Sequence, residues 1–81
     1  MQNVSMKRFA NYCKSRNIEL LKDDLSFIEK RLQRVPLQHQ REALLQYAET
    51  WLAVSAKIAP SAQSQNLGRR AANSYLLLVT E

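Results

Sequence analysis

The sequence predicts an all-α protein, a compact single-domain bundle of about four helices over residues 1–81. Apolar residues recur at spacings of three and four along most of the chain. One glycine and two prolines are too few β-turn formers for an all-β fold. Because 81 residues bury a modest core, self-association into a homodimer is a further expectation.

The first expected helix covers residues 5–16. Its apolar residues lie at positions i, i+3, i+4 and i+7: Met6, Phe9, Ala10 and Cys13. Ser5 suits the N-cap, since its hydroxyl can accept a hydrogen bond from a free N–H of the first turn. Asn17 suits the left-handed residue that ends a helix. Residues 18–20 then form a short extended connector.

The second expected helix lies between the acidic pair Asp23–Asp24 and Pro36. Carboxylates in a first turn favour the positive end of the helix dipole. One apolar stripe follows at spacings of 3, 4 and 3: Leu25, Ile28, Leu32 and Val35. Pro36 ends this helix, because proline disfavours helical conformation in the residue before it.

The third expected helix is the longest, over residues 37–58, and Pro60 ends it. Large apolar residues recur in it every seven positions: Leu37, Leu44, Trp51 and Ile58. Leu45 and Leu52 widen this face, which predicts contacts with more than one neighbouring helix.

A polar loop is expected at residues 61–64, followed by a fourth helix over residues 65–79. Its predicted buried face consists of Leu67, Ala71, Tyr75 and Leu78. Gly68, with Ala71 and Ala72, forms a small-residue patch. Because glycine weakens a helix, this patch predicts close approach of another helix.

The residue inventory argues against an enzyme and against metal or cofactor binding. One Cys and one His exclude a protein-built zinc site and an intramolecular disulfide. The single glycine excludes a P-loop and a dinucleotide fingerprint. Cys13 lies on a buried stripe and His39 in a polar surface stretch. The sequence shows no membrane-spanning run and no signal-peptide core, which predicts a cytoplasmic protein.

The chain is basic, with 12 Lys and Arg against 7 Asp and Glu and a net charge of +5. The cations form small clusters: Lys7–Arg8, Lys30–Arg31 with Arg34, and Arg69–Arg70. A helix-turn-helix is disfavoured, because the acidic Asp23–Asp24 would lead the recognition helix. DNA or RNA binding is the alternative function, against a merely solvated face. The candidate basic surface is Lys30, Arg31, Arg34, Arg41, Arg69 and Arg70.

Binding of a partner protein is the preferred interpretation. Large apolar residues on the last two helices exceed what a small bundle readily buries, and exposed apolar patches mark interfaces. The candidate partner-binding face is Leu45, Leu52, Tyr75, Leu76 and Leu77. Trp51 and Tyr47 are either part of this interface or part of the core.

Residues 66–76 (NLGRRAANSYL) resemble the closing segment of small helical proteins encoded by enterobacterial phages and prophages. Residues 34–36 (RVP), leading into Tyr47 and Trp51, are similar in character. The resemblance implies a bacterial mobile-element origin. It also implies an accessory protein that binds a host or phage macromolecule, as an inhibitor or adaptor, or that assists DNA transactions.

Overall fold

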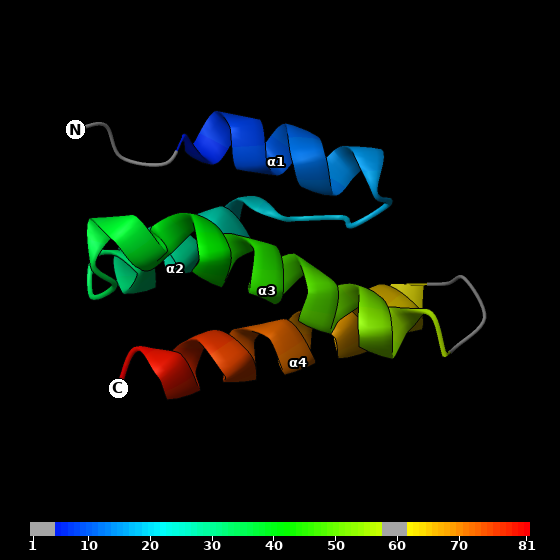
Figure 1. Cartoon of the computed structure of the whole chain (residues 1–81). Coiled ribbons are helices and arrows are strands. Elements are labelled where there is room, and N and C mark those ends of the chain that lie inside the picture. Colours follow the sequence, from blue (N-terminus) through cyan, green and yellow to red (C-terminus); the bar gives the residue numbers. More distant parts are fainter. Residues whose placement is uncertain (1–4, 58–61) are drawn as a thin grey trace.

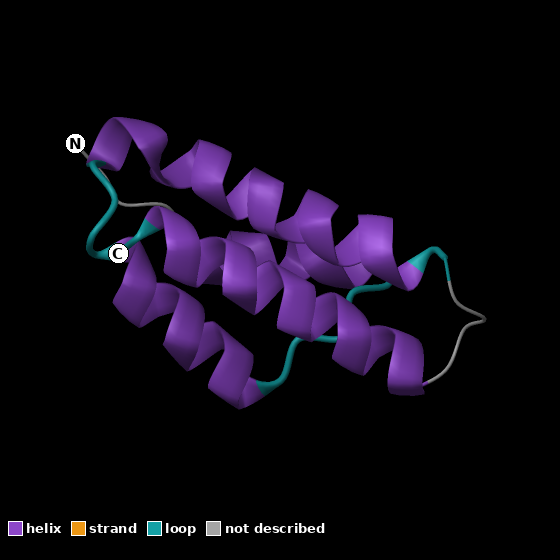
Figure 2. Ribbon diagram, turned by 90° about the horizontal axis from the view of Figure 1, so that it is seen from below, coloured by secondary structure: helices purple, strands orange, loops and turns teal. Residues whose placement is uncertain are grey.

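The computed structural model describes residues 5–57 and 62–81, and it confirms the predicted all-α fold. Four helices form within these residues, and no strand does: α1 (Met6–Ser15), α2 (Lys22–Leu32), α3 (Leu37–Ser55) and α4 (Ala62–Val79). α2 and α3 lie between α1 and α4, so the first and last helices cover opposite sides (Figure 1). α4 runs antiparallel to α3 and also contacts α2 (Figure 2).

The limits of α1 follow from its capping residues, as predicted. The Arg8 N–H donates to Ser5 Oγ at 3.3 Å. Asn17 adopts φ 62°, the left-handed conformation that ends the helix. The chain then turns back through the connector, where Ile18 is buried and Leu20 half-buried.

The predicted ends of the later helices need correction. α2 ends at Leu32, before Val35, and α3 ends at Ser55, while Ile58 and Pro60 lie outside the described residues. The predicted loop at residues 61–64 is wrong over 62–64, because α4 already begins at Ala62. Ser64 is buried, so tertiary packing extends the helix through a stretch whose polarity indicated a loop.

The core centres on two aromatic residues of α3. Tyr47 and Trp51 are both fully buried, which places Trp51 in the core rather than at an interface. Phe9 of α1 packs edge-on against Tyr47, with ring centroids 6.3 Å apart. α3 therefore supplies the aromatic side chains against which the outer helices α1 and α4 pack.

The predicted buried face of α4 is wrong by one residue along the helix. Gly68, Ala72 and Leu76 are buried, whereas the predicted residue Leu78 is 70% exposed. The other three predicted residues are only half-buried: Leu67, Ala71 and Tyr75. The physical reason is the close approach of Trp51, which leaves no room for a Cβ at position 68. One residue is a rotation of about 100°, so this contact selects the inward face.

Candidate binding surface

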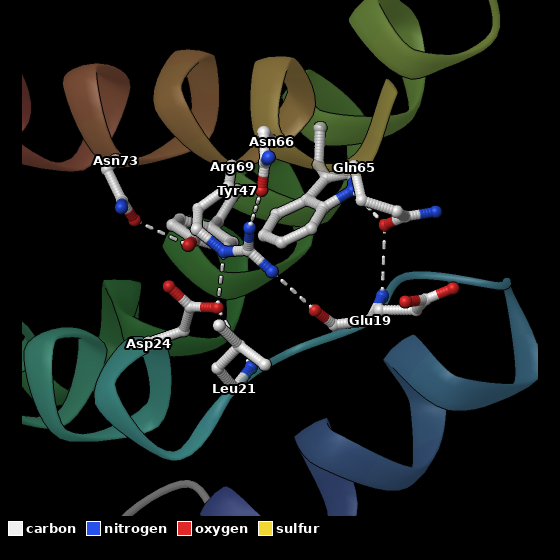
Figure 3. A network of polar contacts seen from close by, with 9 residues as sticks. Glu19, Leu21, Asp24, Tyr47, Gln65, Asn66, Arg69 and Asn73 are labelled. Atoms are coloured by element: carbon white, nitrogen blue, oxygen red, sulfur yellow. Dashed lines mark hydrogen bonds and ion pairs between the residues drawn. The ribbon is translucent and has the colours of Figure 1, made fainter. Parts of the chain in front are cut away.

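Arg69 fixes the rotation of α4 through a partly buried polar network (Figure 3). Its Nε lies 2.7 Å from Asp24 Oδ2, in the only ion pair between described residues. The guanidinium also donates to the Glu19 carbonyl at 2.8 Å and to Asn66 Oδ1 at 2.7 Å. It lies over the Trp51 ring, 5.0 Å from the centroid. This single side chain therefore joins α4 to α2, α3 and the connector.

Gln65 supplies a second set of links at the same end of α4. Its Oε1 accepts hydrogen bonds from Trp51 Nε1 at 3.0 Å and from the Glu19 N–H at 3.1 Å. Its Nε2 donates to the Asn17 carbonyl at 3.0 Å. The indole and the connector thus share one amide group, which satisfies three otherwise unpaired backbone and side-chain groups.

The other end of α4 is held by two arginines, Arg31 in the last turn of α2 and Arg34 in the turn that follows it. Arg31 donates to Thr80 Oγ1 at 2.8 Å and to the Thr80 carbonyl at 3.3 Å. Arg34 donates to the same carbonyl at 3.4 Å. Thr80 Oγ1 in turn donates to the Leu76 carbonyl at 2.6 Å. Cations at a helix C-terminus complement its dipole, so this end of α4 is firmly placed.

With both ends fixed, the last turn of α4 presents three consecutive apolar side chains outward. Leu77 is 43% exposed, Leu78 70% and Val79 49%. We call these three residues the apolar end of α4. A contiguous group of large exposed apolar side chains is typical of an interaction site.

A shallow groove of about 330 Å³ adjoins the apolar end, between α4 and the start of α3. Its apolar lining residues are Val35, Pro36, Ala43, Tyr75 and Val79, and its polar ones are Arg34, His39, Glu42 and Gln46. Partial burial and the nearby Glu42 carboxylate raise the pKa of the Tyr75 phenol. The groove thus combines apolar lining residues with polar and charged ones.

The structure brings together only part of the predicted partner-binding face. Leu76 is fully buried in the core and cannot contact a partner, because α4 is rotated from the predicted orientation. Leu45 and Leu77 are exposed, while Leu52 and Tyr75 are half-buried. Leu52 lines a groove beside α1, whereas Tyr75 lines the groove beside the apolar end.

The predicted basic surface is also divided. Arg69 faces inward to Asp24, and Arg31 and Arg34 converge on Thr80. The remaining three cations are exposed on three different helices: Lys30 on α2, Arg41 on α3 and Arg70 on α4. Residue type and spacing gave no signal that would separate Arg69 from Arg70.

Cys13 is a core residue, as its place on the α1 stripe indicates. The side chain has no exposed surface, and burial raises its pKa from 9.0 to about 12. The thiolate is the reactive form of cysteine, so this thiol is inert at neutral pH.

We therefore expect a thiol reagent such as dithionitrobenzoate to label Cys13 at pH 8 only through unfolding. The rate should rise at least about 100-fold in denaturant, where the thiol is exposed and its pKa is ordinary. The folded pKa lies above the unfolded one, so deprotonation favours the unfolded state and stability should fall as pH rises above about 9. Rapid stoichiometric labelling of the folded protein would contradict the assignment.

Comparisons of the chain with protein-family models, with curated proteins and with solved structures gave no match. Within the described residues, no helix is both long enough and apolar enough to cross a membrane. The same part of the chain holds no group of three or more His, Cys, Asp or Glu side chains that could bind a metal ion.

Proposed function

We propose that this chain is a non-enzymatic binding protein that attaches to a partner protein through the apolar end of α4 and the adjoining groove. The observation that carries this proposal is the exposure of Leu77, Leu78 and Val79 on a helix whose position is fixed at both ends. Burying one such side chain contributes about 1.5–3 kcal/mol. Because these three side chains lie on a helix that is already held in place, they lose little conformational entropy on binding.

The non-enzymatic part of the proposal rests on the state of the chain's only thiol. Cys13 is buried and protonated, so it is unsuited to act as a nucleophile. The single histidine, His39, lies exposed near the start of α3. The role that suits this molecule is steric: a rigid helical face that covers or bridges a partner's surface.

The resemblance of residues 66–76 to phage and prophage proteins supports a bacterial setting. We propose that the chain acts in the cytoplasm of a bacterial host as a mobile-element accessory protein. Its partner is then a host or phage protein, which it inhibits or links to another component. A second copy is a less favourable partner, because a net charge of +5 on each copy opposes self-association.

A pair of leucine variants tests the apolar end. We expect Leu78→Ser to reduce capture of the partner from an enterobacterial lysate at least about 10-fold, because the lost burial is worth 1.5–3 kcal/mol. Leu21→Ser is the matched control: Leu21 is 57% exposed and lies at the start of α2. Immobilised protein and quantitative mass spectrometry of the retained proteins provide the measurement.

Equal capture by the two variants would contradict the proposed site, as would the absence of any protein retained more strongly than on an empty matrix. Light scattering of the purified chain completes the test. A dimer that Leu78→Ser dissociates would assign this surface to a second copy rather than to another protein.

A further inference from the structure

A second surface lies on α1 and is strongly basic. Residues 1–18 contain four cations and no acidic residue, and the first carboxylate of the chain is Glu19. All four are exposed: Lys7, Arg8, Lys14 and Arg16. The candidate basic surface predicted from the sequence did not include these four residues.

The fold gathers three of these four cations on one side of the helix, and Arg16 follows as the C-cap residue. Phe9 and Cys13 face the core, which turns Lys7, Arg8 and Lys14 outward. Asn11 and Ser15 are exposed on the same side, between and beside the cations. Seven residues of helix separate Lys7 from Lys14, or roughly 10 Å. We call Lys7, Arg8, Asn11, Lys14 and Ser15 the outer face of α1.

Among the described residues, no ion pair involves this face. The ion pair that they do form joins Arg69 of α4 to Asp24 of α2. Arg16 lies 5.8 Å over the Tyr12 ring, which leaves its charge intact. α1 covers the opposite side of the molecule from α4, so the outer face is separate from the apolar end (Figure 1).

We propose that the outer face of α1 binds the phosphate backbone of a nucleic acid, independently of the protein-binding surface. Lys, Arg and Asn side chains are usual donors to phosphate oxygens, whereas the Ser15 hydroxyl already donates to the Tyr12 carbonyl at 2.6 Å. One strand of a duplex carries a charge per about 3.4 Å, so the face spans about three phosphates. Such contacts position a protein on the backbone without reading the base sequence.

The composition of the face argues against the other polyanionic partners. Helices that bind membrane surfaces insert an apolar side, but the apolar side of α1 faces this protein's own core. Protein interfaces are depleted in lysine and enriched in aromatic side chains, and the outer face has two lysines and no aromatic residue. Nucleic acid is the polyanion that fits both observations.

Two triple variants of equal charge test this assignment. The first is Lys7→Gln, Arg8→Gln and Lys14→Gln, and the control is Lys22→Gln, Lys30→Gln and Arg70→Gln, whose cations are exposed elsewhere. Both lower the net charge from +5 to +2, because each removes three cations. Glutamine has nearly the helix propensity of the residues it replaces, and circular dichroism verifies folding.

The probe is a fluorescently labelled DNA duplex of about 20 base pairs, followed by anisotropy between about 50 and about 200 mM salt. Three phosphate contacts predict a slope near −2.7 in log K against log salt, and a loss of affinity of about 40-fold over this range. The α1 triple should bring the slope close to zero. The control triple and Leu78→Ser should keep it near −2.7.

Three results would overturn the proposal: no binding to the duplex at the lowest salt, an unchanged slope in the α1 triple, or equal losses in the two triples. Vesicles containing phosphatidylserine provide the comparison probe. Binding to the vesicles without binding to the duplex would assign the face to a membrane surface instead. Loss of duplex binding by Leu78→Ser would show that the two surfaces are not independent.

Discussion

Arg69→Ala should lower the free energy of unfolding by about 3 kcal/mol, a large part of the stability of a small domain. The Arg69 side chain is 16% exposed and that of Asp24 6%, so the pair is shielded from solvent. Removing the guanidinium leaves the Asp24 carboxylate buried, with the Leu21 N–H, which donates to it at 2.9 Å, as its remaining hydrogen-bond donor among the described residues. The Glu19 carbonyl loses a hydrogen bond at the same time.

Arg70→Ala is the matched control, because Arg70 is the next residue on the same helix and is exposed. Its replacement should change stability by less than about 0.5 kcal/mol. Urea denaturation followed by circular dichroism measures both variants. Equal effects would show that the Arg69–Asp24 pair contributes little. If the pair does contribute, a double-mutant cycle that combines Arg69→Ala with Asp24→Ala should give a coupling energy of at least about 1 kcal/mol.

This contrast between adjacent arginines shows where a sequence ceases to be informative. Replacing Arg69 and Arg70 together by acidic residues would destabilise the fold, because the Arg69–Asp24 pair would be lost. Such a double variant could not test whether the two arginines form a basic binding surface. The two residues share type and helix, and they differ by a rotation of about 100°. Only the packing of α4 on its neighbours decides which one meets Asp24.

Features set by local interactions could be predicted from the sequence. The stripe of α1 depends on spacing within one helix, and Ser5 and Asn17 act on the backbone within a few residues of themselves. Burial of Cys13 followed from the same stripe. The all-α class likewise needed only periodicity and the shortage of turn-forming residues.

Features set by contacts between helices could not be predicted in this way. The last helix carries apolar residues on nearly all sides near its end, so periodicity does not select one face. Gly68 against Trp51 selects the face with Ala72 and Leu76, and this choice places Leu78 outside. The predicted partner-binding face therefore included a core leucine, and the most exposed leucine was assigned to the core.

The residues of the two candidate surfaces also depend on contacts between helices that the sequence does not show. Residue composition indicated that apolar side chains would remain exposed on the last two helices, and Leu45 and Leu77 are exposed. Charge counting indicated cations in clusters, yet Arg31 and Arg34 are used to hold Thr80. The distinction between a structural cation and a free one depends on residues more than 40 positions away in sequence.

Gly68→Ala should be strongly destabilising, although alanine is the better helix former by about 1 kcal/mol. A Cβ at this position would lie 2.6 Å from Trp51 Cδ1 and 2.9 Å from the Trp51 carbonyl oxygen. The indole is fully buried and its Nε1 is hydrogen-bonded to Gln65, so it has little room to move. The carbonyl belongs to the α3 backbone. α4 must therefore shift away from α3, and this shift also disturbs Arg69.

We expect a net loss of about 2 kcal/mol, because overpacking a core costs 1–3 kcal/mol and the backbone contact adds to it. For a chain of this length the loss corresponds to a fall in Tm of about 10 °C. Ser74→Ala, at an exposed site of the same helix, is the control and should be neutral or slightly stabilising. In a Trp51→Phe background the smaller ring should relieve part of the clash, so the cost of Gly68→Ala should decrease. An unchanged or raised Tm for Gly68→Ala would show that α3 and α4 do not approach as closely as this contact requires.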